Sequence, residues 1–111
     1  MKIIEINIQE PYYSYIINGQ KIVEGRLNKG KFTEAEIGDI LRINNSVDFK
    51  LIGKNIYKNF KDMILKEGIK NVIPDKEVIE EAVNIYYQFY TTEQEKKFGV
   101  VALKIEAMGK V

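Results

Sequence analysis

The first twenty-six residues alternate between apolar and polar positions in a way that predicts a strand, a short helix and a second strand. Residues 2–9 direct three isoleucines to one face of a strand: Ile4, Ile6 and Ile8. Pro11 suits the first position of a helix, where its missing N–H would be unpaired in any case, and Gly19 can end that helix in a left-handed conformation. The run from Lys21 to Arg26 is rich in Ile and Val and predicts the second strand.

The middle of the chain predicts short strands joined by tight turns. Residues 27–36 show no clear period and contain a glycine, so they predict a mobile loop that can close over the second strand. Residues 40–43 and 49–57 predict two further strands, the second interrupted by a glycine. A turn precedes each of them, at residues 37–39 and 44–46. Several short strands in this arrangement are typical of a small barrel.

Two helices follow, each with a recognisable start. Asn59 can cap the first, and Gly68 ends it after an apolar face formed by Phe60, Met63 and Ile64. Pro74 starts the longest helix, which extends from about Asp75 to Tyr90. The inner side of that helix carries six apolar or aromatic residues: Val78, Ile79, Ala82, Ile85, Tyr86 and Phe89.

The last segment predicts a short helix and a closing strand. Thr92 and Glu95 have the spacing of a capping box, so Glu95 is interpreted as a cap for a backbone N–H at the start of its own helix. Residues 99–106 predict a strand whose inward face carries Val101, Leu103 and Ile105. This order of elements predicts an α+β domain with a partly open barrel flanked by helices.

Composition agrees with a single folded domain. The 111 residues are enough for one core and too few for two. The chain has no apolar run of membrane-spanning length, and its N-terminus lacks the apolar segment and cleavage site of a signal peptide, so we expect a cytoplasmic protein without a membrane partner. The 17 basic and 16 acidic residues leave a net charge of +1, which argues against binding nucleic acid by charge alone.

Several kinds of chemistry are excluded by residue types that the chain lacks. It has no cysteine, which excludes disulfides and thiolate nucleophiles, and no histidine, the commonest metal ligand and near-neutral acid–base. The glycines lack the spacing of a phosphate-binding P-loop. We therefore expect no metal and no cofactor, and any catalysis must use Lys, Glu, Asp, Tyr, Ser or Thr.

The strand from Lys21 to Arg26 carries the first candidate site. Alternation places Glu24 and Arg26 on one face, where they can pair and present a bidentate recognition group to a cleft. Lys21 falls on the opposite face unless the start of the strand is twisted. The alternative interpretation is an exposed ion pair that contributes about 0–1 kcal/mol to stability. Lys29 and Lys31, on the loop that follows, are further candidates for ligand binding.

Tyrosines near the end of the longest predicted helix form a second candidate. Tyr86 and Tyr90 lie one helical turn apart and can offer a stacking face and a hydroxyl group to a base. Tyrosines at this spacing also occur at the edge of a core, which is the competing interpretation. Three glutamates of the same helix face solvent by their periodicity: Glu77, Glu80 and Glu81.

One pattern runs through these segments and resembles a known family. It consists of Gly19-x-Lys21-x-x-Glu24-x-Arg26-Leu27, then Ile37-Gly38-Asp39 before a strand, Tyr57-x-x-Phe60, and Tyr90 followed by Glu93-x-x-x-Lys97-Phe98-Gly99-Val100-Val101. With this pattern the chain resembles the ASCH domain of the PUA-like superfamily, especially its small, stand-alone archaeal and bacterial members. The resemblance implies one ASCH domain over residues 1–111, folded as a PUA-like small β-barrel flanked by helices. It also implies an RNA- or nucleotide-binding cleft beside Lys21, Glu24 and Arg26.

One enzymatic branch of that superfamily hydrolyses N4-acetylcytidine to cytidine and acetate, using a Lys and a Thr of this motif and a separate Glu. The chain matches the Lys with Lys21 and has Glu24 at the position of the Thr, while the separate Glu has no match. A hydrolase acting on a modified nucleoside or on RNA would therefore need Glu24 as general base and Lys21 to stabilise an oxyanion.

Three hypotheses remain open. The first is a module that binds RNA, a nucleoside or a nucleotide through Lys21, Glu24, Arg26, Lys29, Lys31, Tyr86 and Tyr90. In that case Glu24→Ala and Arg26→Ala should abolish binding and change thermal unfolding little. The second is the hydrolase. The third is an interaction domain with structural charges, which a buried and fully paired Arg26 would indicate; no particular protein partner follows from the sequence.

Overall fold

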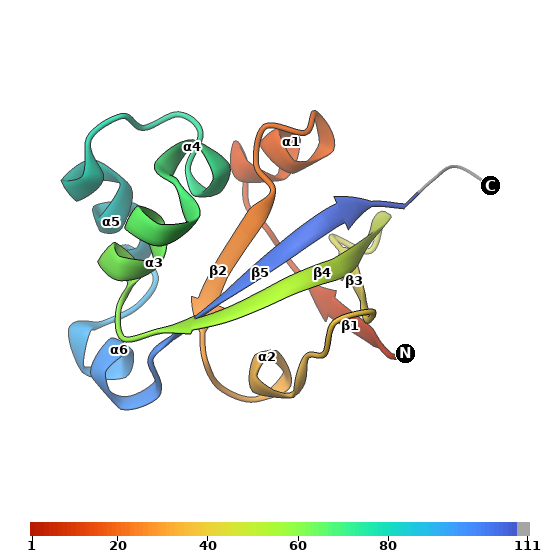
Figure 1. Cartoon of the computed structure of the whole chain (residues 1–111). Helices are drawn as coiled ribbons and strands as arrows, with labels where there is room; N and C mark the ends of the chain where they lie inside the picture. The colour runs from red at the N-terminus through yellow and green to blue at the C-terminus, as the bar shows by residue number, and fades with distance from the viewer. Residues whose placement is uncertain (109–111) are drawn as a thin grey trace.

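The computed structural model describes residues 1–108 and shows one curled sheet with helices around it (Figure 1). The strands are β1 (Ile3–Ile6), β2 (Val23–Leu27), β3 (Ile40–Ile43), β4 (Val47–Tyr57) and β5 (Val100–Ala107). The helices within the described residues are α1 (Tyr12–Ile17), α2 (Lys31–Glu34), α3 (Phe60–Glu67), α4 (Ile69–Val72), α5 (Ile79–Tyr87) and α6 (Thr92–Phe98). The predicted α+β class is confirmed. No helix in this part of the chain is long and apolar enough to cross a membrane.

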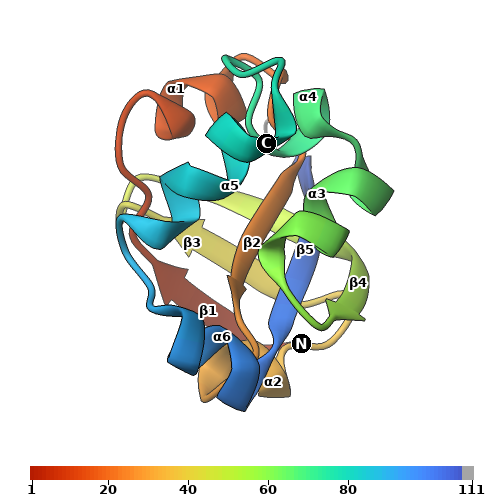
Figure 2. The same ribbon diagram turned by 90° about the vertical axis from the view of Figure 1, so that its left-hand side faces the viewer.

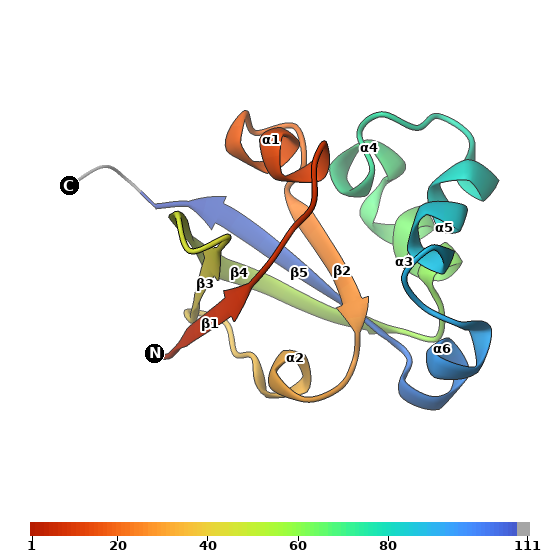
Figure 3. The ribbon, with the colours of Figure 1, turned by 180° about the vertical axis from the view of Figure 1, so that it is seen from behind.

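The sheet has the strand order β1-β3-β4-β5-β2 and curls into a half-barrel. β1 pairs with β3 in parallel, whereas the other three pairings are antiparallel. β4 is the longest strand, and its pairing with β5 shifts register between Leu51 and Gly53, where the sequence predicted an interruption. The barrel is therefore partly open, as predicted, and its two edge strands are β1 and β2 (Figure 3).

β5 separates two hydrophobic cores because both of its faces are buried. Val101, Leu103 and Ile105 point into the half-barrel, where they pack with residues of β1, β3, β4 and α1, as the alternation predicted. Val100 and Ala102 point to the other side, where α3, α4 and α5 cover the sheet (Figure 2). β2 pairs with β5 along one edge, and its other edge is the free edge of the half-barrel. One face of β2 packs against the helix layer.

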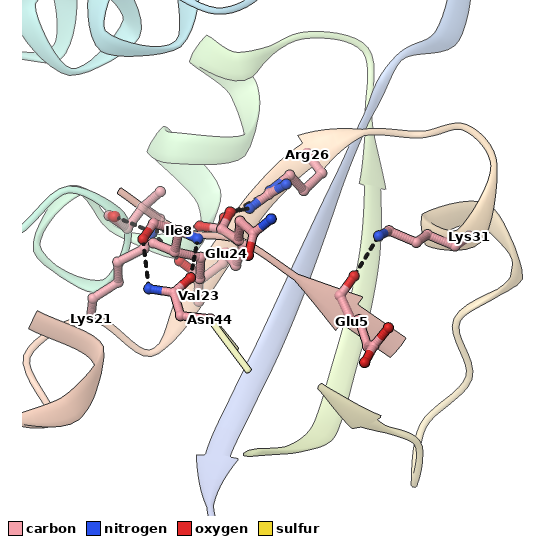
Figure 4. Close-up of polar contacts among 10 residues, drawn as sticks. Glu5, Ile8, Lys21, Val23, Glu24, Arg26, Lys31 and Asn44 are labelled. Atoms are coloured by element: carbon pink, nitrogen blue, oxygen red, sulfur yellow. Dashed lines mark hydrogen bonds and ion pairs between the residues drawn. The ribbon is translucent and has the colours of Figure 1, made fainter. Parts of the chain in front are cut away.

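Side chains, and not a backbone ladder, close the gap between β1 and β2, which we call the seam. Ile40 and Asn44 donate their N–H groups to the carbonyls of Lys2 and Ile6, so the alternate carbonyls of β1 point to its free edge. Lys31 Nζ donates to one of these, the Glu5 carbonyl (Figure 4). Arg26 Nη2 donates to the Asn7 carbonyl at 2.7 Å. Two basic side chains therefore hold the edges of the half-barrel together.

Local signals placed many of the element ends correctly. Pro11 directly precedes α1, and the left-handed Gly19 lies just beyond its end. The Asn59 side chain accepts a hydrogen bond from Asp62 N–H and caps α3, which ends at Gly68. The buried side of α3 is the predicted one, Phe60, Met63 and Ile64.

Other predictions were wrong. α5 begins at Ile79, because Pro74 and Asp75 form a turn, and its buried residues are Ala82, Val83 and Tyr86. Val78 and Phe89, predicted to face inward, are exposed. The predicted loop at 27–36 contains α2, and the segment between Gly68 and Pro74, for which no helix was predicted, contains α4. Both helices have only four residues, too few for a periodic pattern.

The prediction for Glu95 was also wrong. The capping box of α6 consists of Thr91 and Gln94. The buried Glu95 carboxylate accepts a hydrogen bond from the Phe60 N–H at 2.8 Å and from the Tyr87 hydroxyl at 2.9 Å. Glu95 is thus a cap, but for the first turn of α3, and it ties α3, α5 and α6 together.

Candidate functional site

A cavity of about 150 Å³ lies at the free edge of β2, between α1 and α5. The segment after β1 contributes Asn7, Ile8 and Gln9, and α1 contributes Tyr12. β2 and the residues before it contribute Lys21, Glu24, Gly25 and Arg26. The remaining wall consists of Ile73, Ile85, Tyr86, Phe89 and Tyr90. The cavity therefore combines one cluster of charged side chains with a largely aromatic wall.

Glu24 is the centre of the charged cluster. One carboxylate oxygen lies 3.2 Å from Lys21 Nζ, and the other accepts a hydrogen bond from Arg26 Nε at 2.8 Å (Figure 4). The side chains of Lys21 and Glu24 are only 1% and 8% exposed. Lys21 joins the cluster because β2 begins two residues later, at Val23, so strict strand alternation does not apply to it.

The Lys21 ammonium group is held by the fold on all three of its donor positions. Besides facing Glu24, Nζ donates to the carbonyls of Val23 at 2.7 Å and Val72 at 2.6 Å. Its backbone N–H donates to the Tyr15 carbonyl in α1. An ammonium group has three N–H donors. Lys21 therefore connects α1, β2 and α4 and has little donor capacity left for a ligand.

Burial and mutual attraction shift the pKa values of the cluster in different directions. Burial lowers the pKa of Lys21, and the charge of Glu24 opposes this only in part. Burial alone would raise the pKa of Glu24, but the charges of Lys21 and Arg26 outweigh it and lower that pKa. For Arg26, the pairing with Glu24 outweighs burial and raises the pKa. Glu24 is therefore ionised at neutral pH and Arg26 is charged.

Arg26 keeps free donors. Nε is bound to Glu24 and Nη2 to the Asn7 carbonyl, whereas Nη1 has no hydrogen-bond partner among residues 1–108. A guanidinium group has five N–H donors in one plane. The central carbon of this group, Cζ, lies 5.2 Å from the centre of the Phe32 ring in α2. Arg26 is thus half-buried and only partly paired. An interaction domain with structural charges would have a buried and fully paired Arg26, and the structure meets this condition only in part.

The aromatic wall is held in place by Phe60 of α3. The Phe60 ring stacks on Tyr86, with ring centres 4.4 Å apart, and on Tyr90, with ring centres 5.5 Å apart. Burial raises the pKa of Tyr86 far above its ordinary value, and its enclosed hydroxyl has no hydrogen-bond partner among the described residues. Phe89, which is 51% exposed, lies on the outer part of the wall.

Gly25 is required by close packing behind the cavity. A Cβ atom at this position would lie 2.5 Å from Met63 Cε and 3.0 Å from the Tyr86 hydroxyl. Ile22 accepts a hydrogen bond from Ile105 N–H, so the alternate residues of β2, including Gly25, turn their backbone N–H and C=O groups to the free edge. A backbone donor and acceptor thus lie beside Glu24 and Arg26.

The structure brings five of the seven predicted site residues to one cavity: Lys21, Glu24, Arg26, Tyr86 and Tyr90. Lys29 and Lys31 do not line it. Tyr12 and Phe89 line the wall although neither was predicted as a site residue; Phe89 was predicted only for the inner side of the longest helix. Residues 1–108 contain no group of three or more Asp or Glu side chains that could hold a metal ion.

Comparison with known families identifies the chain. A family model described as the ASCH domain matches residues 6–109. The chain belongs to the ASCH domain family. The half-barrel with its surrounding helices agrees with a PUA-like fold for this ASCH domain. A search of proteins with curated descriptions finds no match.

Two solved structures resemble this ASCH domain over almost its whole length. The crystal structure of the hypothetical protein PH0355 is 44% identical in sequence, with a TM-score of 0.92, and the match covers 97% of this chain and 100% of that one. The solution NMR structure of protein PF0455 from Pyrococcus furiosus is 34% identical, with a TM-score of 0.82, and the match covers 99% and 100%.

Proposed function

We propose that this ASCH domain binds the base of an unpaired nucleotide, in RNA or in a free nucleoside or nucleotide. The observation that carries the proposal is a cavity that combines stacking walls with unpaired polar groups on a strand edge. Bases of single-stranded RNA offer two flat faces and exposed hydrogen-bonding edges, which is the complement of such a cavity.

The size of the cavity favours a single ring. A volume of about 150 Å³ is below the roughly 300–1,000 Å³ of pockets that enclose whole drug-sized ligands. In another protein, a cavity of about this volume holds one benzene ring. One heterocyclic ring therefore fits here, with the sugar and phosphate outside the cavity.

The polar groups can read the edge of a base. Arg26 Nη1 can donate to a carbonyl oxygen or a ring nitrogen, while each Glu24 oxygen faces one cation and can accept a further hydrogen bond from an amino group. The N–H and C=O groups of Gly25 add a donor and an acceptor. With Lys21 and Arg26 charged, the cluster has one positive charge in excess, which favours nucleotides over nucleosides.

The geometry supports binding better than hydrolysis. The lowered pKa of Glu24 makes its carboxylate a weak general base at neutral pH. Lys21, the expected oxyanion stabiliser, already donates to Val23 and Val72. Consumption of N4-acetylcytidine, followed by chromatography, would overturn this preference.

Calorimetric titration with the four ribonucleoside 5′-monophosphates and short RNA oligomers tests the proposal. Phe89→Ala should weaken binding about tenfold, because stacking contributes about 1–3 kcal/mol per base. Leu65→Ala is the matched control, since Leu65 on α3 is 58% exposed, comparable with Phe89 at 51%, and lies outside the cavity wall. Equal affinities for the two variants, or no binding of any mononucleotide by the parent, would overturn the proposal.

A further inference from the structure

Cations lie over two phenylalanine rings on the side of the molecule where β2 ends. Arg26 Cζ and Lys31 Nζ lie 5.2 and 5.5 Å from the centre of the Phe32 ring. Lys29 Nζ and Lys97 Nζ lie 4.9 and 5.2 Å from the centre of the Phe98 ring. Of the five cation–aromatic contacts between residues 1 and 108, four lie on these two rings. We call this cluster the basic–aromatic patch; it consists of Arg26, Lys29, Lys31, Lys97, Phe32 and Phe98.

The patch is continuous across two segments that are far apart in the sequence. Asn28 N–H donates to the Gly99 carbonyl at 3.0 Å, which places the residues before α2 against the end of α6. Lys29 then reaches Phe98, the last residue of α6. Figure 2 shows α2 and α6 at the same end of the molecule. Lys29, Lys31 and Lys97 are exposed, whereas both phenylalanine rings are half-buried.

The patch is strongly basic, although the net charge of the whole chain is only +1. Residues 25–33 and 96–99 contain five basic residues and no acidic one. The rest of the chain therefore has twelve basic and sixteen acidic residues, although the total charge is only +1. Of the acidic residues that directly flank these segments, Glu24 and Glu95 are buried and engaged by internal partners, whereas Glu34 at the end of α2 is exposed. Five basic residues against one exposed flanking carboxylate leave the patch positively charged.

We propose that the basic–aromatic patch binds the phosphates and neighbouring bases of a single-stranded RNA, one base of which occupies the cavity. This inference rests on the proposed function and extends it from one base to a strand. Arg26 belongs to both sites, because it lines the cavity and lies over Phe32. The RNA strand leaves the cavity at Arg26 and continues over Phe32 and Phe98, while Lys29 and Lys97 turn from the Phe98 ring to its phosphates. Lys31 adds positive charge beside the strand and keeps its hydrogen bond to the Glu5 carbonyl.

Single-stranded RNA fits the patch better than an acidic peptide does. Surfaces for single strands combine cations that follow the phosphates with aromatic rings on which bases stack. The patch offers both kinds of group, because two cations lie over each of its two aromatic rings. An acidic peptide would use the cations and leave the rings without planar partners.

The experiment compares a 5′-mononucleotide with a fluorescein-labelled RNA of eight nucleotides at several salt concentrations. The test variant is Lys29→Ala/Lys97→Ala, in which neither residue lines the cavity. The matched control is Lys50→Ala/Lys66→Ala, which removes two exposed lysines outside both sites. We expect the test variant to bind the mononucleotide as the parent does and the RNA less tightly. Its plot of log affinity against log salt should be shallower by about 1.4, since each lost phosphate contact reduces the slope by about 0.7.

The outcomes separate the two proposals. If the mononucleotide binds but test and control variants bind RNA equally, the patch assignment is wrong and the cavity assignment stands. If RNA binds through the patch while no mononucleotide binds, the patch stands and the proposed function of the cavity falls. Equal competition by a polyglutamate peptide would overturn the assignment of the patch to RNA.

Discussion

Replacing Glu24 with alanine should destabilise the fold strongly. The carboxylate lies 3.2 Å from Lys21 Nζ and 2.8 Å from Arg26 Nε, and the Lys21 side chain is almost completely buried. Removing one partner of a buried pair costs about 3–5 kcal/mol, because the other charge is left without compensation. For a chain of this size, 1 kcal/mol corresponds to about 4 °C, so Tm should fall by roughly 12–20 °C. This replaces the expectation from sequence that thermal unfolding changes little.

The loss of stability is measured by comparing the free energies of urea unfolding of Glu24→Ala and of a control variant, Glu77→Ala. Glu77 is also a glutamate paired with a lysine, but it is 84% exposed and lies 3.6 Å from Lys70 Nζ. Such a surface pair contributes about 0–1 kcal/mol. The Glu24→Ala penalty should shrink at high pH, because Lys21 has a lowered pKa and its neutral amine needs no counter-charge. Equal free energies of unfolding for the two variants would refute this reasoning.

Two further predictions concern the same cavity. The pKa of Glu24 is lowered in the fold, so its contribution to stability is complete above the unfolded value of about 4.3 and is lost as pH falls through the folded value. The urea midpoint of the parent should therefore drop more steeply than that of Glu24→Ala between about pH 5 and pH 2, and parallel curves would contradict this. Tyr86→Phe should raise the free energy of unfolding by about 1 kcal/mol, because it removes a buried hydroxyl without a partner. Tyr90→Phe is its control, and a lower urea midpoint for Tyr86→Phe would show that the hydroxyl is satisfied.

The helices and strands that are determined by residues close together in the sequence could be predicted. Alternation identified β1 and β5, and Asn59 and Gly68 bounded α3, because caps and periodic faces act over a few residues. The start of α5 could not be found in this way. Pro74 is a residue type that favours the first position of a helix, but here it lies in a turn. The residue before it, Ile73, is buried and lines the cavity, which is a contact between distant parts of the chain.

The candidate site shows the same division. Glu24 and Arg26 pair on one strand face as alternation suggested, whereas Lys21 reaches Glu24 only because β2 begins after it. The partner of Glu95 is the Phe60 N–H, thirty-five residues away, and no local pattern specifies such a contact. Lys29 and Lys31 were assigned to the cavity because their loop follows β2, but α2 turns this segment toward α6 and β1.

The seam between β1 and β2 also affects how copies of this chain behave at high concentration. The edge of a sheet can serve as a template for a strand from another molecule, which is a common route to aggregation. Here a strand approaching β1 would have to displace Lys31 from the Glu5 carbonyl and Arg26 from the Asn7 carbonyl. Both cations would then be left beside the new strand without these acceptors. The side chains that close the half-barrel therefore also discourage the sheet from extending into a neighbouring molecule.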